Sequence, residues 1–289
     1  MKYLKPRSIG EAVDLLASSQ GMVLAGGTDA CVYMAEGICS PEALIDISDL
    51  DALKGIETVV VEAGEETVRI GACTTLAEIA ASELLPNCLR QGAHAVGSPQ
   101  IRNLGTIGGN VCNASPCGDT LAPLLTLDAR LVLRSTDGTR IVASSDFFTG
   151  PKQTVMESHE ILEAIEFPAA FRGKASAFRM IGNRKGQAIS QVNAAVCVTV
   201  DSGTIADVRV AVGSVAPIPL RLAKLEEFLP GRAIADVDPN EIREPVIEGI
   251  RPIDDVRSTA TYRQEVTVSL VFDALRACAV QVAGEGAGP

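Results

Sequence analysis

Residues 102–119 read RNLGTIGGNVCNASPCGD, a run of glycine, amide and other small residues. This stretch is the most informative part of the sequence about the fold and the kind of ligand that it could bind. Side chains this small let the backbone lie close to a flat or phosphorylated ligand. Asn110, Asn113 and Asp119 can hydrogen-bond the polar edges of such a ligand, and a carboxylate suits ribose or ribityl hydroxyls. The composition predicts a long loop from about position 97 to 120. A connection that only satisfies its own backbone is the alternative.

A second glycine-rich stretch, LAGGTDA at 24–30, stands where a short apolar run ends. Consecutive backbone N–H groups in such a turn can form a concave anion site, and the Thr28 hydroxyl adds a donor for a pyrophosphate oxygen. A simple tight turn at Gly26-Gly27 is the alternative.

Outward from these stretches, the N-terminal residues predict a small α/β unit. Ser8 and Glu11 form a capping box for a helix over 8–20, and strands are expected at 22–25 and 43–47.

The middle of the chain, residues 57–168, predicts an α+β arrangement. Thr75 and Glu78 cap a short helix, and Asp137-Gly138 marks a hairpin. The remaining expected elements are strands at 58–61, 68–72, 131–133 and 141–142 and a helix at 86–96.

A boundary is expected near 172–174. Beyond it, strands at 192–200 and 205–212 flank the turn Asp201-Ser202-Gly203, and helical spacing of apolar residues from about Tyr262 predicts a closing helix.

Composition narrows the class of protein. The 289 residues are 47% hydrophobic and 21% charged, and the net charge of −11 disfavours nucleic acid or an anionic membrane as partner. The N-terminus lacks the apolar run of a signal peptide, which predicts a cytoplasmic protein. Eight cysteines without a C-x-x-C pair, and two histidines, predict reduced thiols and no metal site.

Together, the stretches 24–30 and 102–119 resemble, in residues and spacing, the FAD-binding medium subunit of the xanthine dehydrogenase and carbon monoxide dehydrogenase family of molybdenum hydroxylases. The likeness covers essentially the whole chain. It continues in Phe178-Arg179-Met180, Asn183-Arg184-Lys185, Ala188-Ile189-Ser190, Gly213-Ser214-Val215-Ala216-Pro217, Pro219-Leu220-Arg221, Asp255-Val256-Arg257 and Tyr262-Arg263.

This resemblance implies an α+β fold in three parts. A two-part FAD-binding domain of the PCMH type would comprise a small α/β subdomain at 1–56 and a larger α+β subdomain at 57–172. A C-terminal α+β domain at 173–289 would carry a three-stranded antiparallel sheet and helices.

The resemblance also implies the cofactor-binding residues. The first loop would hold the FAD pyrophosphate, the second would approach the flavin and its phosphates, Asp119 would take a sugar hydroxyl, and Ile161 and Leu162 would line the flavin pocket. Arg179 falls where the family often has lysine. The implied residues are Leu24, Ala25, Gly26, Gly27, Thr28, Asp29, Ala30, Thr106, Gly108, Gly109, Asn110, Asn113, Asp119, Ile161, Leu162 and Arg179.

The implied protein is an oxidoreductase subunit without catalytic side chains of its own. Its FAD would be non-covalent, because neither loop has a histidine, and no iron–sulfur cluster is expected, because the cysteine-rich insertion of some relatives is missing. The [2Fe–2S] clusters would lie on a small partner subunit and the molybdenum cofactor on a large one, in a dimer of heterotrimers.

Several functional alternatives stay open. The terminal electron acceptor could be NAD⁺, dioxygen or a quinone, and the substrate of the large subunit is not encoded in this chain. A scaffold subunit without cofactor is one rival. Another is a self-contained flavin oxidoreductase, which would need its own placed acid or base, and neither His94 nor His159 has a supporting constellation.

Overall fold

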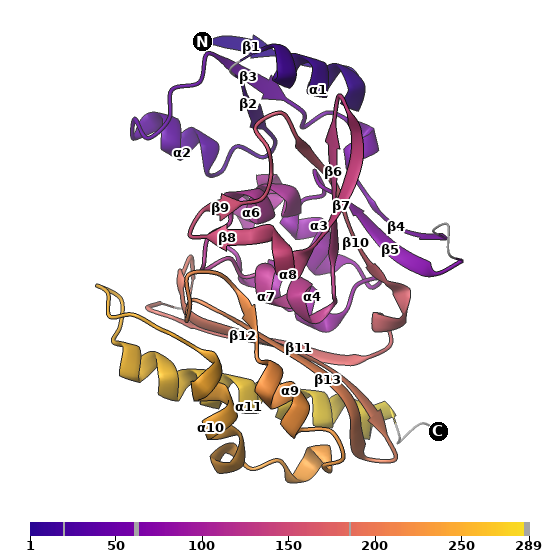
Figure 1. Ribbon diagram of the computed structural model, residues 1–289, viewed down its shortest axis with the longest axis vertical. Coiled ribbons are helices and arrows are strands. Elements are labelled where there is room, and N and C mark those ends of the chain that lie inside the picture. Colours follow the sequence, from indigo (N-terminus) through magenta and orange to yellow (C-terminus); the bar gives the residue numbers. More distant parts are fainter. Residues whose placement is uncertain (20, 61–63, 185, 286–289) are drawn as a thin grey trace.

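The computed structural model describes residues 1–19, 21–60, 64–184 and 186–285, which form three tiers along the long axis (Figure 1). Each tier is built around its own main sheet, and helices pack on all three sheets. The predicted α+β class is confirmed.

The N-terminal tier is a three-stranded parallel sheet with strand order β1-β3-β2 and one covering helix. Helix α1 buries Ala12, Val13 and Leu16 in a cluster with Ile45 of the central strand. The Ser8 side chain caps the helix, but the Glu11 carboxylate accepts from the Arg7 N–H rather than from Ser8, so only half of the predicted capping box forms. The predicted helix end at Gln20 lies outside the described residues. The elements are β1 (Lys2–Leu4), α1 (Ile9–Ser18), β2 (Gly21–Leu24), α2 (Ala30–Ala35), β3 (Ala43–Asp46) and the 3₁₀ turn η1 (Asp51–Leu53).

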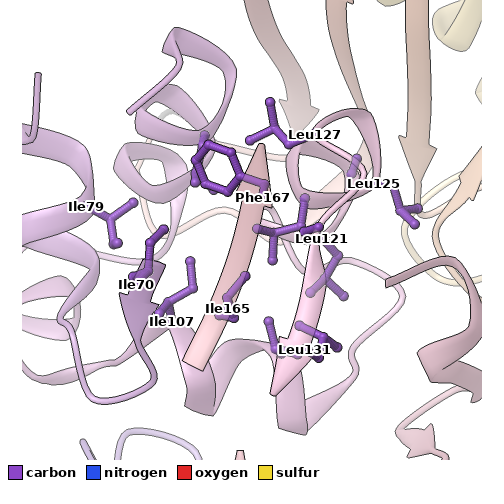
Figure 2. Packing of buried hydrophobic residues seen from close by; sticks show 14 of the residues in the cluster. Ile70, Ile79, Ile107, Leu121, Leu125, Leu127, Leu131, Ile165 and Phe167 are labelled. Carbon is purple, nitrogen blue, oxygen red and sulfur yellow. The ribbon is translucent and has the colours of Figure 1, made fainter. Parts of the chain in front are cut away.

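The middle tier is a five-stranded antiparallel sheet with strand order β4-β5-β10-β6-β7. Ile70, Leu131, Ile165 and Phe167 point from its strands into a core shared with the neighbouring helices (Figure 2). The strands are β4 (Ile56–Val60), β5 (Glu66–Gly71), β6 (Arg130–Ser135), β7 (Gly138–Ala143) and β10 (Ile161–Pro168). Val61, the predicted end of the first strand, lies outside the described residues.

Two local predictions in this tier are confirmed. Thr75 and Glu78 form a complete capping box for α3, and β6 and β7 form the predicted hairpin. The hairpin turn is made by Thr136 and Asp137, and Gly138 opens β7 with a φ of +130°, a conformation that glycine adopts readily.

The loop predicted from about 97 to 120 is wrong, because this stretch contains two short helices and leads into a third. Thr106 caps α6 by accepting from the Gly109 N–H at 3.1 Å. The N–H groups of Ile107 and Gly108 donate to the carbonyls of Thr74 and Ala72, which follow β5, at 3.0 and 2.8 Å. Tertiary hydrogen bonds thus hold a glycine-rich helix that propensity disfavours. The helices are α3 (Leu76–Ala81), α4 (Asn87–Ala95), α5 (Pro99–Leu104), α6 (Ile107–Asn113) and α7 (Leu121–Thr126).

A small excursion follows the hairpin and returns the chain to the sheet. It comprises α8 (Ser144–Phe147) and the two-stranded pair β8 (Phe148–Gly150) and β9 (Gln153–Thr154). The 3₁₀ turn η2 (Ala169–Phe171) then leads to the C-terminal tier.

The C-terminal tier is an antiparallel sheet with order β11-β12-β13-β14. The three long strands match the predicted three-stranded sheet, and a two-residue strand that was not predicted extends it. Along β12 the side chains alternate: Ala194 and Val196 face the C-terminal helices, whereas Ala195 and Cys197 join the core of the middle tier. The strands are β11 (Ala175–Gly182), β12 (Ser190–Asp201), β13 (Thr204–Gly213) and β14 (Leu220–Arg221), and the helices are α9 (Ala223–Phe228), η3 (Ile234–Asp236), α10 (Pro239–Gly249) and α11 (Ala260–Glu285).

The closing helix α11 is long and apolar enough, by length and composition, to cross a membrane. Here it lies along the C-terminal sheet, and Val271, Ala274, Leu275 and Cys278 are buried against it. The same apolar residues therefore serve as the core of this tier.

Candidate functional site

The two glycine-rich stretches meet backbone to backbone between the first and middle tiers. A Cβ added at Gly26 would lie 1.9 Å from the Leu104 carbonyl oxygen, and one added at Gly108 would lie 2.6 Å from the Ala72 carbonyl oxygen. Real Cβ atoms do not approach that closely, so both positions need glycine. The stretch 24–30 is thus fixed against the junction of α5 and α6.

A cleft of 440 Å³ opens where these segments meet, within the size range of small-molecule and cofactor sites. Its wall is mainly apolar, with polar groups at a few places. It is lined by Met22, Val23, Ala25, Gly26, Gly27, Thr28, Asp29, Ala30, Tyr33, Ile47, Ala72, Cys73, Leu76, Val96, Ile101, Gly105, Thr106, Gly108, Gly109, Asn110, Cys112, Asn113, Lys152, Met156, Glu160, Ile161 and Leu162.

The first loop offers main-chain donors to the cleft. Within the described parts of the chain, the N–H groups of residues 26–30 donate to no protein acceptor. Gly27 has a φ of +70°, which turns the chain sharply here. Successive free N–H groups in such a turn can form a concave site for an anion.

The N-terminus of α6 offers no comparable set of donors. Its first N–H groups, from Ile107 to Asn110, are satisfied by Thr74, Ala72 and Thr106. The second glycine-rich stretch therefore supplies shape and side-chain amides to the cleft rather than a main-chain anion site.

Two asparagines of α6 present oriented amides. Asn110 Oδ1 accepts from the Thr120 hydroxyl and Asn113 Oδ1 from the Tyr33 hydroxyl, each at 2.7 Å. With their oxygens occupied, the NH₂ groups are left to donate to acceptors on a ligand.

Most residues predicted from the sequence line this one cleft. They are Ala25, Gly26, Gly27, Thr28, Asp29, Ala30, Thr106, Gly108, Gly109, Asn110, Asn113, Ile161 and Leu162.

Leu24, Asp119 and Arg179 do not line it. Leu24 is the last residue of β2, directly before the glycine loop. Arg179 lies on β11, where its guanidinium donates to the Phe178 carbonyl at 2.8 Å. The structure thus brings the two loops and β10 together but leaves these three side chains outside the cleft wall.

Sequence reasoning missed one wall of the cleft. Tyr33 comes from α2, Lys152 from the turn between β8 and β9, and Met156 and Glu160 from the segment before β10. Glu160 is paired with Arg140, whose Nε and Nη2 donate at 2.5 and 2.7 Å. Of these residues, only Lys152 had a local signal in the sequence, since the preceding Pro151 favours a turn. The others match no known ligand-binding motif.

Asp119 is buried, with 5% of its surface exposed, and lies between the middle and C-terminal tiers. It accepts from the Ser190 hydroxyl at 2.5 Å and from the Asn193 amide at 3.0 Å. Burial raises the pKa of the Asp119 carboxyl to about 6, and these two hydrogen bonds offset part of that rise.

Replacing Asp119 by asparagine is expected to stabilise the protein above pH 6. The carboxyl pKa is about 4 in the unfolded chain and about 6 in the fold, so stability falls as pH rises through this interval, by roughly 3 kcal/mol. An amide oxygen keeps both hydrogen bonds without the charge. Urea unfolding of wild type and Asp119→Asn at pH 4 and pH 8 measures the difference, which should appear only at the higher pH. A variant less stable than wild type at pH 8 would contradict this account.

Within the described chain, no group of three or more His, Cys, Asp or Glu side chains is placed to hold a metal ion. Neither His94 nor His159 lines the cleft. Free main-chain donors, oriented amides and apolar walls fit a flat dinucleotide such as FAD.

Comparison with known proteins gives the family. Residues 1–170 match the model of the FAD binding domain in molybdopterin dehydrogenase, and residues 176–278 match the CO dehydrogenase flavoprotein C-terminal domain. The chain belongs to this molybdopterin dehydrogenase FAD-binding family.

Individual relatives match over almost their entire length. A xanthine dehydrogenase FAD-binding subunit of Escherichia coli O157:H7 is 30% identical, over 95% of this chain and 96% of its own. The carbon monoxide dehydrogenase medium chain of Hydrogenophaga pseudoflava is 32% identical, over 96% of each. A chain of the reconstituted CO dehydrogenase from Oligotropha carboxidovorans superposes with a TM-score of 0.89 at 30% identity, covering 97% of this chain and 98% of that one. The predicted family and its FAD cofactor are confirmed, and the chain is an oxidoreductase component.

Proposed function

We propose that this chain receives electrons from the [2Fe–2S] clusters of a small partner subunit and delivers them to an external acceptor. A large partner subunit with the molybdenum cofactor would transform the organic substrate. The observation that carries the proposal is the cleft of main-chain donors and apolar walls on a chain whose relatives are FAD-binding or medium subunits of dehydrogenases.

The chain's own residues bind and orient the cofactor in this proposal. The N–H groups of residues 26–30 hold the pyrophosphate, and the amides of Asn110 and Asn113 meet polar edges. Ile161, Leu162 and Leu76 exclude water from the flavin. When bound, FAD supplies the capacity to take up electrons singly and release them in pairs.

Proton chemistry on an organic substrate has little support in this cleft. Among its described lining residues there is no histidine, and of the two carboxylates, Asp29 and Glu160, the second is held by Arg140. Hydrogen bonds from Arg140 keep the pKa of Glu160 below its usual value, so this carboxylate is a poor base. These features favour the electron-transfer subunit over a self-contained flavin oxidoreductase.

The test is reduction of bound FAD with and without partners. The chain is purified with its co-purifying subunits, reduced anaerobically with the substrate of the large subunit, and followed by its visible flavin absorption. We expect bleaching in the assembled enzyme and none in the separated, FAD-loaded chain given the same substrate. Bleaching of the separated chain would favour the self-contained oxidoreductase.

The FAD is proposed to be non-covalent. Neither glycine-rich stretch contains a histidine, and the described lining of the cleft has none. Acid precipitation of the purified protein should therefore leave all flavin in the supernatant as FAD, identified by chromatography. Flavin in the pellet that resists washing under denaturing conditions would contradict this.

Three further points are proposals of the same kind. The assembly is a dimer of heterotrimers, its location is the cytoplasm, and the chain divides into units at 1–56, 57–172 and 173–289. The sheets support the first boundary to within one residue, because β4 of the middle sheet begins at Ile56, and the second because β11 of the C-terminal sheet begins at Ala175.

A further inference from the structure

Lys152 combines an unfavourable backbone conformation with a fixed side chain at the cleft. It follows Pro151 in the turn between β8 and β9 and has a φ of +58°, which glycine or asparagine adopts far more readily than lysine. Its N–H donates to the carbonyl of Ala114, at 2.9 Å, and Ala114 ends α6 with a φ of +46°. Two left-handed residues thus hold the turn against the end of α6.

The Lys152 side chain is anchored by Tyr33 of α2. Its ammonium donates to the Tyr33 hydroxyl and lies 4.3 Å from the centroid of the Tyr33 ring. The Tyr33 hydroxyl in turn donates to Asn113 Oδ1 at 2.7 Å. An ammonium has three donors, so two remain for another acceptor.

The charges of the other lining residues indicate what the Lys152 ammonium could bind. Among the described lining residues Lys152 is the one basic side chain, whereas Asp29 and Glu160 are acidic. Arg140 neutralises Glu160 from outside the lining. A pyrophosphate brings negative charge next to Asp29, and main-chain N–H groups offset it only in part.

The Lys152 ammonium is held near the residues that would bind a pyrophosphate. Tyr33 lies one helical turn beyond Ala30, the residue that closes the set of free N–H groups in residues 26–30. An ammonium fixed on Tyr33 is therefore held by the helix that directly follows the free N–H groups, in the same cleft.

We propose that Lys152, held by Tyr33 and Asn113, is a positioning residue that pairs with the FAD pyrophosphate and closes the anion site opposite residues 26–30. This rests on FAD occupying the cleft.

The first experiment measures binding of FAD and of ADP, which carries the pyrophosphate without the flavin ring. The full chain, with any co-purifying subunits, is freed of FAD and titrated with each ligand at rising salt. Lys152→Met should weaken both ligands about ten- to hundredfold and flatten the salt dependence, since a charge-assisted hydrogen bond is lost. Lys152→Arg should bind nearly as wild type. The matched control is Lys224→Met, which removes a lysine paired with Glu248 outside the cleft.

Lys152→Gly separates charge from folding. Glycine relieves the left-handed strain, so this variant should melt no lower than wild type yet bind both ligands as weakly as Lys152→Met. Tyr33→Phe should weaken FAD binding roughly two- to tenfold, and should add little in a Lys152→Met background.

Each contrary result has a distinct meaning. If the Lys152→Met and Lys152→Gly proteins bind FAD like wild type, the proposed role of Lys152 is overturned, whereas FAD binding in the cleft is not. Weakened FAD binding with unchanged ADP binding, or a shifted flavin midpoint potential at unchanged affinity, would move Lys152 to the flavin and also overturn it. Wild-type protein that binds neither ligand would sink the cofactor assignment together with the inference.

Discussion

Gly26→Ala is expected to weaken FAD binding about hundredfold or more, because the added methyl group has no room. Its position lies 1.9 Å from the Leu104 carbonyl oxygen and 2.6 Å from the Leu104 carbonyl carbon. These are backbone atoms, which cannot rotate aside as a side chain can. The stretch 24–30 must therefore separate from α5, and displacing a ligand cradle by about an ångström costs a large factor in function.

Flavin fluorescence quenching measures this loss, and thermal melting of the FAD-free protein tests whether the fold survives. Gly173→Ala is the matched control, because a methyl group there meets nothing within 4 Å. The control should bind FAD like wild type. A Gly26→Ala protein that retains wild-type affinity would show that the contact with Leu104 does not shape the site.

Asp255→Ala is expected to cost about 3–5 kcal/mol of unfolding free energy, because it leaves a buried guanidinium without a counter-charge. Arg263 is 2% exposed and donates to Asp255 Oδ1 at 2.6 Å and to the Ser214 carbonyl at 2.8 Å. Asp255 also accepts from Arg257, whose Nε and Nη2 lie at 3.0 and 2.6 Å. The Asp255 carboxylate therefore ties the segment before α11 to the helix, and Arg263 extends this link to Ser214, directly after β13.

Chemical denaturation at neutral pH measures the loss. Removing the lysine of the exposed Lys224–Glu248 pair should cost at most about 1 kcal/mol. The double variant Asp255→Ala/Arg263→Met should be more stable than Asp255→Ala alone, since no buried charge is then unpaired. Equal losses for the exposed and the buried pair would contradict this reasoning.

The Asp255 carboxylate also makes the stability of the wild-type protein depend on pH in the acid range. Hydrogen bonds from Arg257 hold the pKa of Asp255 well below its usual value. A depressed pKa adds stability that is fully present above about pH 4, the unfolded value, and is lost as pH falls further.

Local signals predicted much of the fold. The Thr75–Glu78 capping box, the β6–β7 hairpin and the pair β12–β13 depend on neighbouring residues, and the sequence sufficed for them. Helix α6 could not be predicted this way, because its glycines disfavour a helix and hydrogen bonds to Thr74 and Ala72 hold it. Strand β1 has three residues and is defined only by pairing with β3.

In the candidate site, too, local sequence patterns predicted some residues, whereas others are brought together only by the fold. Residues of the two glycine-rich stretches could be named because glycine, threonine and asparagine at loop positions have a direct chemical meaning. Tyr33 and Lys152 are 119 positions apart and meet only in the folded protein, so no local pattern marks them. For Asp119 the sequence marked a carboxylate able to accept hydrogen bonds but not its distant partners, the Ser190 hydroxyl and the Asn193 amide of β12.

The alternation along β12 also limits how this protein can be recombined with its relatives. Ala195 and Cys197 on that strand, and Ala211 on β13, complete the core beneath α4 and α7. The C-terminal sheet therefore packs against helices of the FAD-binding half on one face and against its own helices on the other. Cutting the chain near residue 172 would strip an apolar face from the FAD-binding half as well as from the other. Chimeras with a foreign C-terminal half should thus be soluble only when the grafted strands carry apolar residues of matching size on that face, including one in place of Phe178 of β11.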